Sequence, residues 1–293
     1  MYSLLHDYRK FEKLAKRYDG SDSIDASKEY FLAPATITPL FCFMQRNNIP
    51  KIEVNNNTLE FVNRIINKTE TNTTKHFEDL PKTNEEWIKQ QPAHKMAEKI
   101  NHERYGGYST VYHICDELIS NIYNHTPMEK GYANRGYSFT QEYVNGDRLD
   151  ICFLDDGLSI PGKFEMNNID FIDDCDAISK ATYGYTTERK SDGSIDNSRG
   201  HGLWTTLKLV VERNKGSALI VSRNGLLHIP KQGKWNYKLL NNNEYFKGTL
   251  IALRLTPNPV EDYYGAIDIF SGKTKYEYNK IKKIGRPKLV NSN

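Results

Sequence analysis

The chain has 293 residues, enough for one large or two medium-sized domains. Its 40 Lys and Arg residues nearly balance its 37 Asp and Glu residues, and the net charge of +3 argues neither for nor against a nucleic-acid partner. No apolar run approaches the roughly 20 residues of a membrane-spanning helix, so a membrane protein is not expected.

The N-terminus and the cysteines both predict a cytoplasmic protein. The first residues, MYSLLHDYRK, lack the apolar core of a signal peptide. The cysteines lie far apart and mostly within apolar segments, at positions Cys42, Cys115, Cys152 and Cys175. That spacing fits neither a zinc site nor a disulfide framework, and we expect buried, reduced thiols.

Residues 1–66 are predicted to form a small α/β unit. Its elements in chain order are a helix over 1–18, a strand over 29–32, a helix over 37–46 that follows Pro34, a strand over 51–54 and a helix over 59–66. Strands that alternate with helices are typical of a layered α/β structure. This order resembles that of the STAS-like modules that partner anti-sigma-type ATPases. The alternative is an N-terminal extension that packs on the domain that follows.

Residues 67–84 are polar and rich in Thr, Asn and Lys, which predicts a linker. Helical character returns over 85–104, where Pro92 is expected to kink or split the helix. Gly106-Gly107 separates this region from the next helix. A larger domain is predicted over 85–260.

The next helix carries three polar residues on one face. Glu117, Asn121 and His125 are each four residues apart, which stacks their side chains along the helix. The residues around them are apolar at helical intervals, so this face is expected to be half buried, where unused polar groups cost free energy. The amide oxygen suits Mg²⁺, which prefers oxygen ligands, and the acid can orient or deprotonate a water or hydroxyl.

A β-hairpin follows, with strands over 137–144 and 148–154 joined by an Asn-Gly turn. The second strand runs into Asp155-Asp156-Gly157, where a glycine allows close approach of the backbone to a ligand. A second hairpin is predicted over 217–222 and 226–229, again around Asn-Gly. Helices that alternate with hairpins predict an α/β sandwich with a mixed sheet covered on one face.

Between the two hairpins, the run Gly200-His201-Gly202-Leu203 opens an apolar helix. Backbone amides in a glycine loop at a helix N-terminus bind phosphate groups, helped by the helix dipole. Arg199, just before the loop, is well placed to pair with a phosphate oxygen. Gly248-Thr249 begins the last predicted strand.

These four motifs, in this order and over roughly residues 85–257, resemble the GHKL ATPase superfamily of gyrase, the heat-shock chaperone, histidine kinases and the mismatch-repair clamp. The resemblance implies a two-layer α+β sandwich of the Bergerat type, with a mixed, mostly antiparallel sheet covered by helices on one face. It also implies ATP and Mg²⁺ as cofactors. Residues 163–198 would form a lid over the triphosphate, and 261–293 a basic, solvated tail.

The resemblance assigns roles at the phosphate end of the nucleotide. Glu117 would be the general base, and Asn121 the magnesium ligand that bridges the metal to the triphosphate. His125 would lie near the phosphates or serve as a structural histidine. The glycine loop and His201 would bind phosphate, and Leu203 would pack the new helix on the sheet.

At the adenine end, Asp155 would accept a hydrogen bond from the exocyclic amine. Asp156 is the alternative, if the family's aspartate is aligned one residue later. Gly157 would let the backbone approach the base, and Thr249 would reach the base through water. Ser159 stands where the family often has a second glycine. Sensor histidine kinases often carry Asn where this chain has Glu117, so the anti-sigma-type kinases are the closer branch.

Two functions remain open at this stage. In the first, Glu117 acts in slow ATP hydrolysis or in phosphoryl transfer to a Ser or Thr of a protein partner. In the second, the chain is a nucleotide-controlled protein-binding module with little or no turnover. A DNA clamp is least favoured, because the transducer domain with its catalytic lysine is missing. The expected partners are ATP or ADP and a regulatory protein, with a homodimer left open and neither nucleic acid nor membrane expected.

Overall fold

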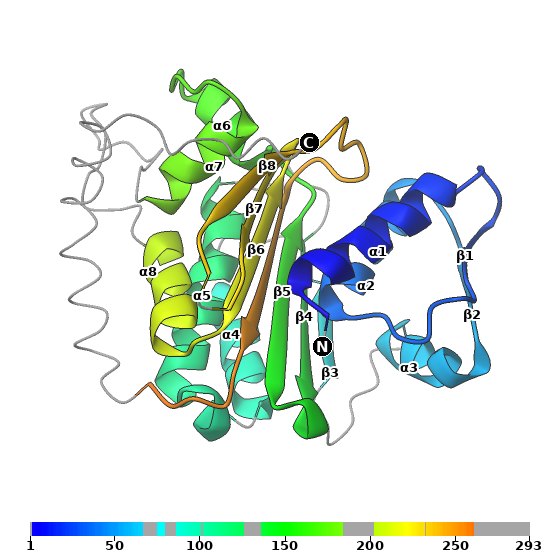
Figure 1. Cartoon of the computed structure of the whole chain (residues 1–293), viewed down its shortest axis with the longest axis horizontal. Coiled ribbons are helices and arrows are strands. Elements are labelled where there is room, and N and C mark those ends of the chain that lie inside the picture. Colours follow the sequence, from blue (N-terminus) through cyan, green and yellow to red (C-terminus); the bar gives the residue numbers. More distant parts are fainter. Residues whose placement is uncertain are drawn as a thin grey trace.

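The computed structural model describes residues 2–66, 75–79, 86–100, 102–125, 136–183, 202–231 and 233–260. A seven-stranded sheet forms the centre of the molecule (Figure 1). Its strands are β3 (Lys75–Asp79), β4 (Gly136–Tyr143), β5 (Arg148–Asp155), β6 (Ser217–Ser222), β7 (Gly225–Ile229), β8 (Asn236–Leu239) and β9 (Thr249–Leu255). Their order is β3-β4-β5-β9-β6-β7-β8.

The predicted sheet was mixed and mostly antiparallel, and every strand pair described in this sheet is antiparallel, so only the mixed character is corrected. Short connections join β4 to β5 and β6 to β7, where Asn-Gly turns were predicted, and a tight turn can only reverse the chain. The last strand, β9, then enters between β5 and β6 and runs antiparallel to both.

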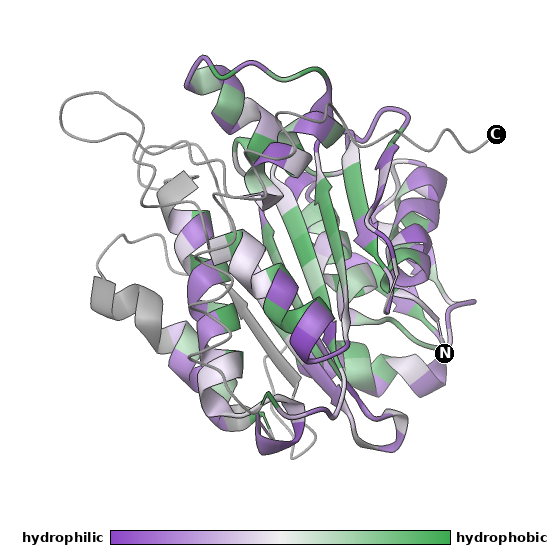
Figure 2. Cartoon of the chain, turned by 60° about the vertical axis from the view of Figure 1, so that its left-hand side comes forward, coloured by the Kyte–Doolittle hydropathy of each residue, from purple (hydrophilic) through white to green (hydrophobic). Residues whose placement is uncertain are grey.

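One face of the sheet is covered by α4 (Glu86–Lys99), α5 (Tyr108–His125) and α8 (Gly202–Lys208), which continues as one π-helical turn over Leu209–Arg213. Alternate residues of β5 and β9, such as Ile151 and Leu253, enter this core. The α6 (Ser159–Met166) and α7 (Asp174–Thr182) helices follow β5. Figure 2 shows hydrophobic residues along the central strands and hydrophilic residues on the outer helical surfaces.

Helices cover the opposite face as well, which corrects the prediction of a sheet covered on one face only. The α1 (Leu4–Arg17) and α2 (Pro34–Arg46) helices pack there on the intervening residues of the same strands, including Cys152 and Ala252. The N-terminal segment and the sheet therefore share one hydrophobic core. The prediction of a two-layer sandwich still describes α4, α5, α8 and the sheet on which they pack.

The rest of the N-terminal segment contains a parallel pair of strands, β1 (Ser23–Ala26) and β2 (Lys51–Val54), and α3 (Asn56–Ile66). The predicted strand over 29–32 is wrong. The carbonyls of Glu29 and Tyr30 accept hydrogen bonds from side chains at the start of α3, Asn55 and Thr58, instead of from a neighbouring strand. The helices near 1–18, 37–46 and 59–66 and the strand over 51–54 are confirmed.

Two other boundaries differ from the prediction. The proposed linker over 67–84 contains strand β3, and its remaining residues, 67–74 and 80–84, lie outside the described part of the chain. The helix expected over 85–104 is α4 followed by a 3-10 turn at His102–Tyr105, and Pro92 lies inside α4. Of the predicted lid over 163–198, residues 184–198 lie outside the described part of the chain, and within the rest α7 begins at Asp174, where the Asp173 side chain accepts a hydrogen bond from Asp176 N and caps the helix.

A buried ion cluster joins α1 to the sheet. Arg254 of β9 donates to both carboxylate oxygens of Asp150 on β5, at 2.6 and 2.7 Å, and to Asp7 of α1 at 2.9 Å. All three residues are buried. In the described part of the chain, no helix is both long and apolar enough to cross a membrane.

Candidate functional site

Three polar side chains lie side by side at one end of the sheet. Asp155 ends β5, Thr249 begins β9 and Ser222 ends β6, and these strands are direct neighbours. Leu154 pairs with Leu250, and Ser222 pairs with Thr249. Because side chains alternate along a strand, all three polar residues are on the face that α5 and α8 cover. The two residues predicted for the adenine end, Asp155 and Thr249, are therefore brought together.

The carboxylate of Asp155 is held by the backbone around it. One oxygen accepts a hydrogen bond from Gly157 N at 2.9 Å, and the other accepts one from Thr249 N at 3.2 Å. Asp155 is only 4% exposed. Its neighbour Asp156 is half-buried and accepts from Lys247 N at 3.2 Å. Of the two aspartates, Asp155 is the one that the fold orients on the α5 side of the sheet.

Gly248 is required for this arrangement. A Cβ atom at Gly248 would lie 2.1 Å from the carbonyl oxygen of Asp155, 2.3 Å from its Oδ1 and 2.6 Å from the nitrogen of Gly157. Two of these three atoms are backbone atoms, which cannot move aside as a side chain does. The glycine before Thr249 thus lets β9 approach the aspartate-glycine turn.

The helix acid and the second glycine motif also meet. Gly202 is the first residue of α8, and a Cβ atom there would lie 1.8 Å from Glu117 Oε2. The Glu117 carboxylate therefore occupies the space that a side chain would fill, directly beside the N-terminus of α8. Residues 199–201, which include Arg199, Gly200 and His201, lie outside the described residues.

The pKa of the Glu117 carboxyl differs from its ordinary value. Its pKa is raised above the ordinary value of 4.5, first by burial and then by the neighbouring charge of Asp116. His113 lies one turn earlier on α5, and burial lowers its pKa to about 4, so its imidazole is neutral at pH 7. His113 was not among the predicted site residues, although it continues the four-residue spacing of Glu117 and Asn121.

Asn121 is half-buried and lies one turn after Glu117 on α5. His125 is the last residue of this helix, and its side chain is not described. Among the described residues, no group of three or more His, Cys, Asp or Glu side chains could hold a metal ion. The predicted magnesium site at Asn121, in which one amide oxygen holds the ion and phosphates and waters fill the other positions, would not form such a group.

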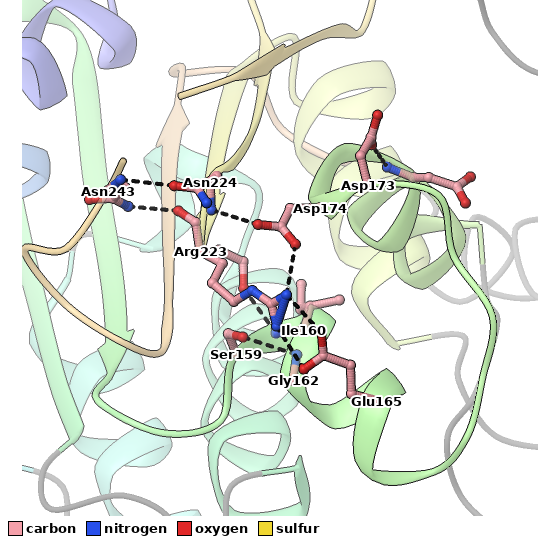
Figure 3. A network of polar contacts seen from close by, with 11 residues as sticks. Ser159, Ile160, Gly162, Glu165, Asp173, Asp174, Arg223, Asn224 and Asn243 are labelled. Carbon is pink, nitrogen blue, oxygen red and sulfur yellow. Dashed lines mark hydrogen bonds and ion pairs between the residues drawn. The ribbon is translucent and has the colours of Figure 1, made fainter. Parts of the chain in front are cut away.

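The residues that surround these groups hold α6, α7 and α8 in place. Leu203 is half-buried and packs on the α5-side core. Arg223, in the β6–β7 turn, donates two hydrogen bonds of 2.8 Å to Glu165 of α6 and pairs with Asp174 of α7 at 3.2 Å (Figure 3). Asp174 also accepts from Asn224 N at 2.9 Å. Both helices that follow the aspartate-glycine turn are thus fixed to the sheet.

Comparisons of this chain with protein-family models, with curated proteins and with solved structures found no match.

Proposed function

We propose that this protein binds Mg-ATP in a GHKL-type domain with a Bergerat-type fold. The contact between Glu117 and Gly202 is the observation that carries the proposal. These two residues are 85 positions apart, and nothing in the separate motifs requires them to meet. A phosphate site formed by a helix acid, an amide and a helix N-terminus requires that Glu117 and Gly202 lie in contact.

The adenine end has the chemistry that the proposal needs. A carboxylate accepts about four hydrogen bonds, so Asp155 can accept one from an exocyclic amine in addition to those from Gly157 N and Thr249 N. Because the backbone already orients Asp155, little conformational freedom is lost when a base binds. An acceptor at this position favours adenine over guanine, whose oxo group would face the same oxygens.

At the phosphate end, Asn121 would hold Mg²⁺ through its amide oxygen, and the metal would neutralise charge on the triphosphate. The N-terminus of α8 would contribute backbone N–H groups to the phosphates. Ionised Glu117 would accept a proton from a water or from a Ser or Thr hydroxyl of a protein partner. The reaction would be slow ATP hydrolysis or phosphoryl transfer in a regulatory switch, in which positioning and electrostatics supply most of the rate.

Nucleotide titrations test this proposal. Mg-ATP at 100 times its Kd should stabilise the protein by about 2.7 kcal/mol in thermal or chemical unfolding, and Mg-GTP at the same concentration should not. Asp155→Asn should abolish the preference for ATP. Asp156→Asn is the matched control and should retain it. An equal response to ATP and GTP in the unmodified protein would contradict the proposal.

A further inference from the structure

Ser222, the last residue of β6, connects the two sides of the adenine end. It is fully buried, at 0% exposure. Its hydroxyl oxygen accepts a hydrogen bond from Ile160 N at 2.9 Å, and Ile160 lies in the first turn of α6. The same oxygen lies 2.8 Å from Thr249 Oγ1. One hydroxyl thus contacts both the segment that follows the aspartate-glycine turn and the threonine of β9.

The number of protons in this chain of hydrogen bonds limits what Thr249 can do. A serine hydroxyl carries one proton and two lone pairs, and one lone pair already accepts from Ile160 N. If Ser222 donates its proton to Thr249 Oγ1, both groups are satisfied and Thr249 keeps its own proton to donate. If Thr249 donates to Ser222, it has no proton left for a ligand.

We propose that Ser222 is a positioning residue that donates to Thr249 and so makes the Thr249 hydroxyl a donor beside the Asp155 acceptor. This inference rests on the proposed nucleotide function of the site. A donor next to an acceptor is complementary to the edge of a 6-aminopurine, where a ring nitrogen accepts and the amine donates. A 6-oxopurine presents the opposite order, because its oxo group accepts and its ring nitrogen donates.

The hydrogen bond from Ile160 N to Ser222 lies at the same end of the site. The segment between Asp155 and Ile160 includes Ser159, whose φ of 69° lies in the left-handed region. Such a conformation costs free energy in a residue other than glycine and needs support from its surroundings. The hydrogen bond from Ile160 N to Ser222 provides support from a neighbouring strand. Ser222 therefore links the position of this turn to the orientation of Thr249.

A double-mutant cycle separates positioning from general loss of structure. The variants are Ser222→Ala, Thr249→Val and the double variant, with Kd values for Mg-ATP and Mg-GTP measured by isothermal titration calorimetry. Ser222→Ala should weaken Mg-ATP binding by about tenfold, the effect of one hydrogen bond, and leave Mg-GTP unchanged. In the Thr249→Val background, the same replacement should have little further effect, because Ser222 acts through Thr249.

Ser217→Ala is the matched control, since Ser217 lies at the other end of β6 and points toward the opposite face. It should bind Mg-ATP like the unmodified protein. If Ser222→Ala does not fold, Ser222→Cys keeps a weak donor of similar size and should give an intermediate Kd. Two results would overturn this inference and leave the proposed function intact. One is that Ser222→Ala weakens Mg-ATP binding equally in the unmodified and the Thr249→Val backgrounds, and the other is that it weakens Mg-ATP and Mg-GTP binding equally. Failure of the unmodified protein to bind Mg-ATP would overturn the proposed function and this inference with it.

Discussion

The two faces of the central sheet hold buried charge in different ways. On the α1–α2 face, Arg254 donates hydrogen bonds to Asp150 and Asp7, although burial still raises the pKa of the Asp7 carboxyl. On the α5–α8 face, Glu117 is beside another acid, and its pKa is raised by burial and by Asp116. Both carboxyls have a raised pKa, but a cation offsets the charge of Asp7, as a buried structural cluster requires, whereas a second acid adds to the shift at Glu117, as is typical of functional sites.

The same contrast applies to the glycines. Gly248 packs against backbone atoms of Asp155 and Gly157, so its role is to let two segments meet. Gly202 packs against the end of the Glu117 side chain, which can move. Replacement of Gly248 should lower the stability of the fold, whereas replacement of Gly202 should weaken nucleotide binding at the site. The difference between the faces can therefore be tested by comparing effects on stability with effects on nucleotide binding.

The largest expected effect on stability is that of Arg254. Arg254→Met removes the cation and leaves Asp7 and Asp150 buried without it, which should lower the free energy of unfolding by about 3–5 kcal/mol in urea denaturation. Arg17→Met changes an exposed arginine of α1 and should stay within about 0.5 kcal/mol of the unmodified protein. A loss below about 1 kcal/mol for Arg254→Met would show that the cluster is not a structural anchor.

Gly202→Ala should weaken nucleotide binding more than it lowers stability. The added methyl group requires the Glu117 carboxylate to move, and Mg-ATP binding or turnover should fall by about tenfold or more. The free energy of unfolding should change little, because alanine favours a helix by about 1 kcal/mol over glycine. Gly146→Ala, in the β4–β5 connection, is the control for nucleotide binding. Normal turnover in Gly202→Ala would remove this contact from the site.

Glu117→Gln distinguishes an enzyme from a binding module. If Glu117 is the base, the variant should bind Mg-ATP and lose about 10²–10⁴-fold in turnover, measured as phosphate release. Asp116→Asn should retain turnover, because Asp116 acts on the site only through its charge. Undiminished turnover in Glu117→Gln would exclude Glu117 as the base, and no turnover in the unmodified protein would favour the binding module.

The raised pKa of Glu117 sets the expected pH dependence. The base is lost as pH falls through this pKa, so turnover should decline at a pH above the ordinary value of 4.5. Asp116→Asn should move the decline to lower pH. Ionisation of Glu117 should support turnover but lower stability, because the folded protein disfavours the charged form above the raised pKa. Glu117→Gln should therefore stabilise the protein at neutral pH. This gain should disappear below about pH 4.5, where the carboxyl is protonated in both the folded and the unfolded protein.

The smallest expected effect concerns Ser159. Its left-handed backbone suits glycine, so Ser159→Gly should raise the free energy of unfolding by about 0.5–1 kcal/mol, less whatever its hydrogen bond from Gly162 N at 3.1 Å contributes. Ser179→Gly in the middle of α7 should instead lower it. Equal destabilisation by both replacements would mean that the backbone at Ser159 carries no strain.

Local signals in the sequence predicted most elements near the site. The Asn-Gly turns identified both hairpins, and the spacing of Glu117, Asn121 and the apolar residues identified α5. These features depend on residues close together in the chain. The meeting of Glu117 with Gly202 depends on long-range packing, and only the resemblance to a known family predicted that they would lie together.

Other features had no local signal. The packing of α1 and α2 on the far face depends on contacts between distant segments, and α1 alone shows only an apolar side. Strand β3 lies in a polar stretch and exists because it pairs with β4. Ser222 was read only as part of a hairpin, because its role depends on Ile160 and Thr249, which other elements bring to it.

A crystal structure of the protein with Mg²⁺ and a non-hydrolysable ATP analogue would show directly whether the two ends of the site hold one nucleotide. We expect adenine against Asp155 and Thr249, the phosphates at the N-terminus of α8, and the metal on Asn121. A nucleotide bound away from both ends of this site, or a site that stays empty at millimolar nucleotide, would contradict the proposed function.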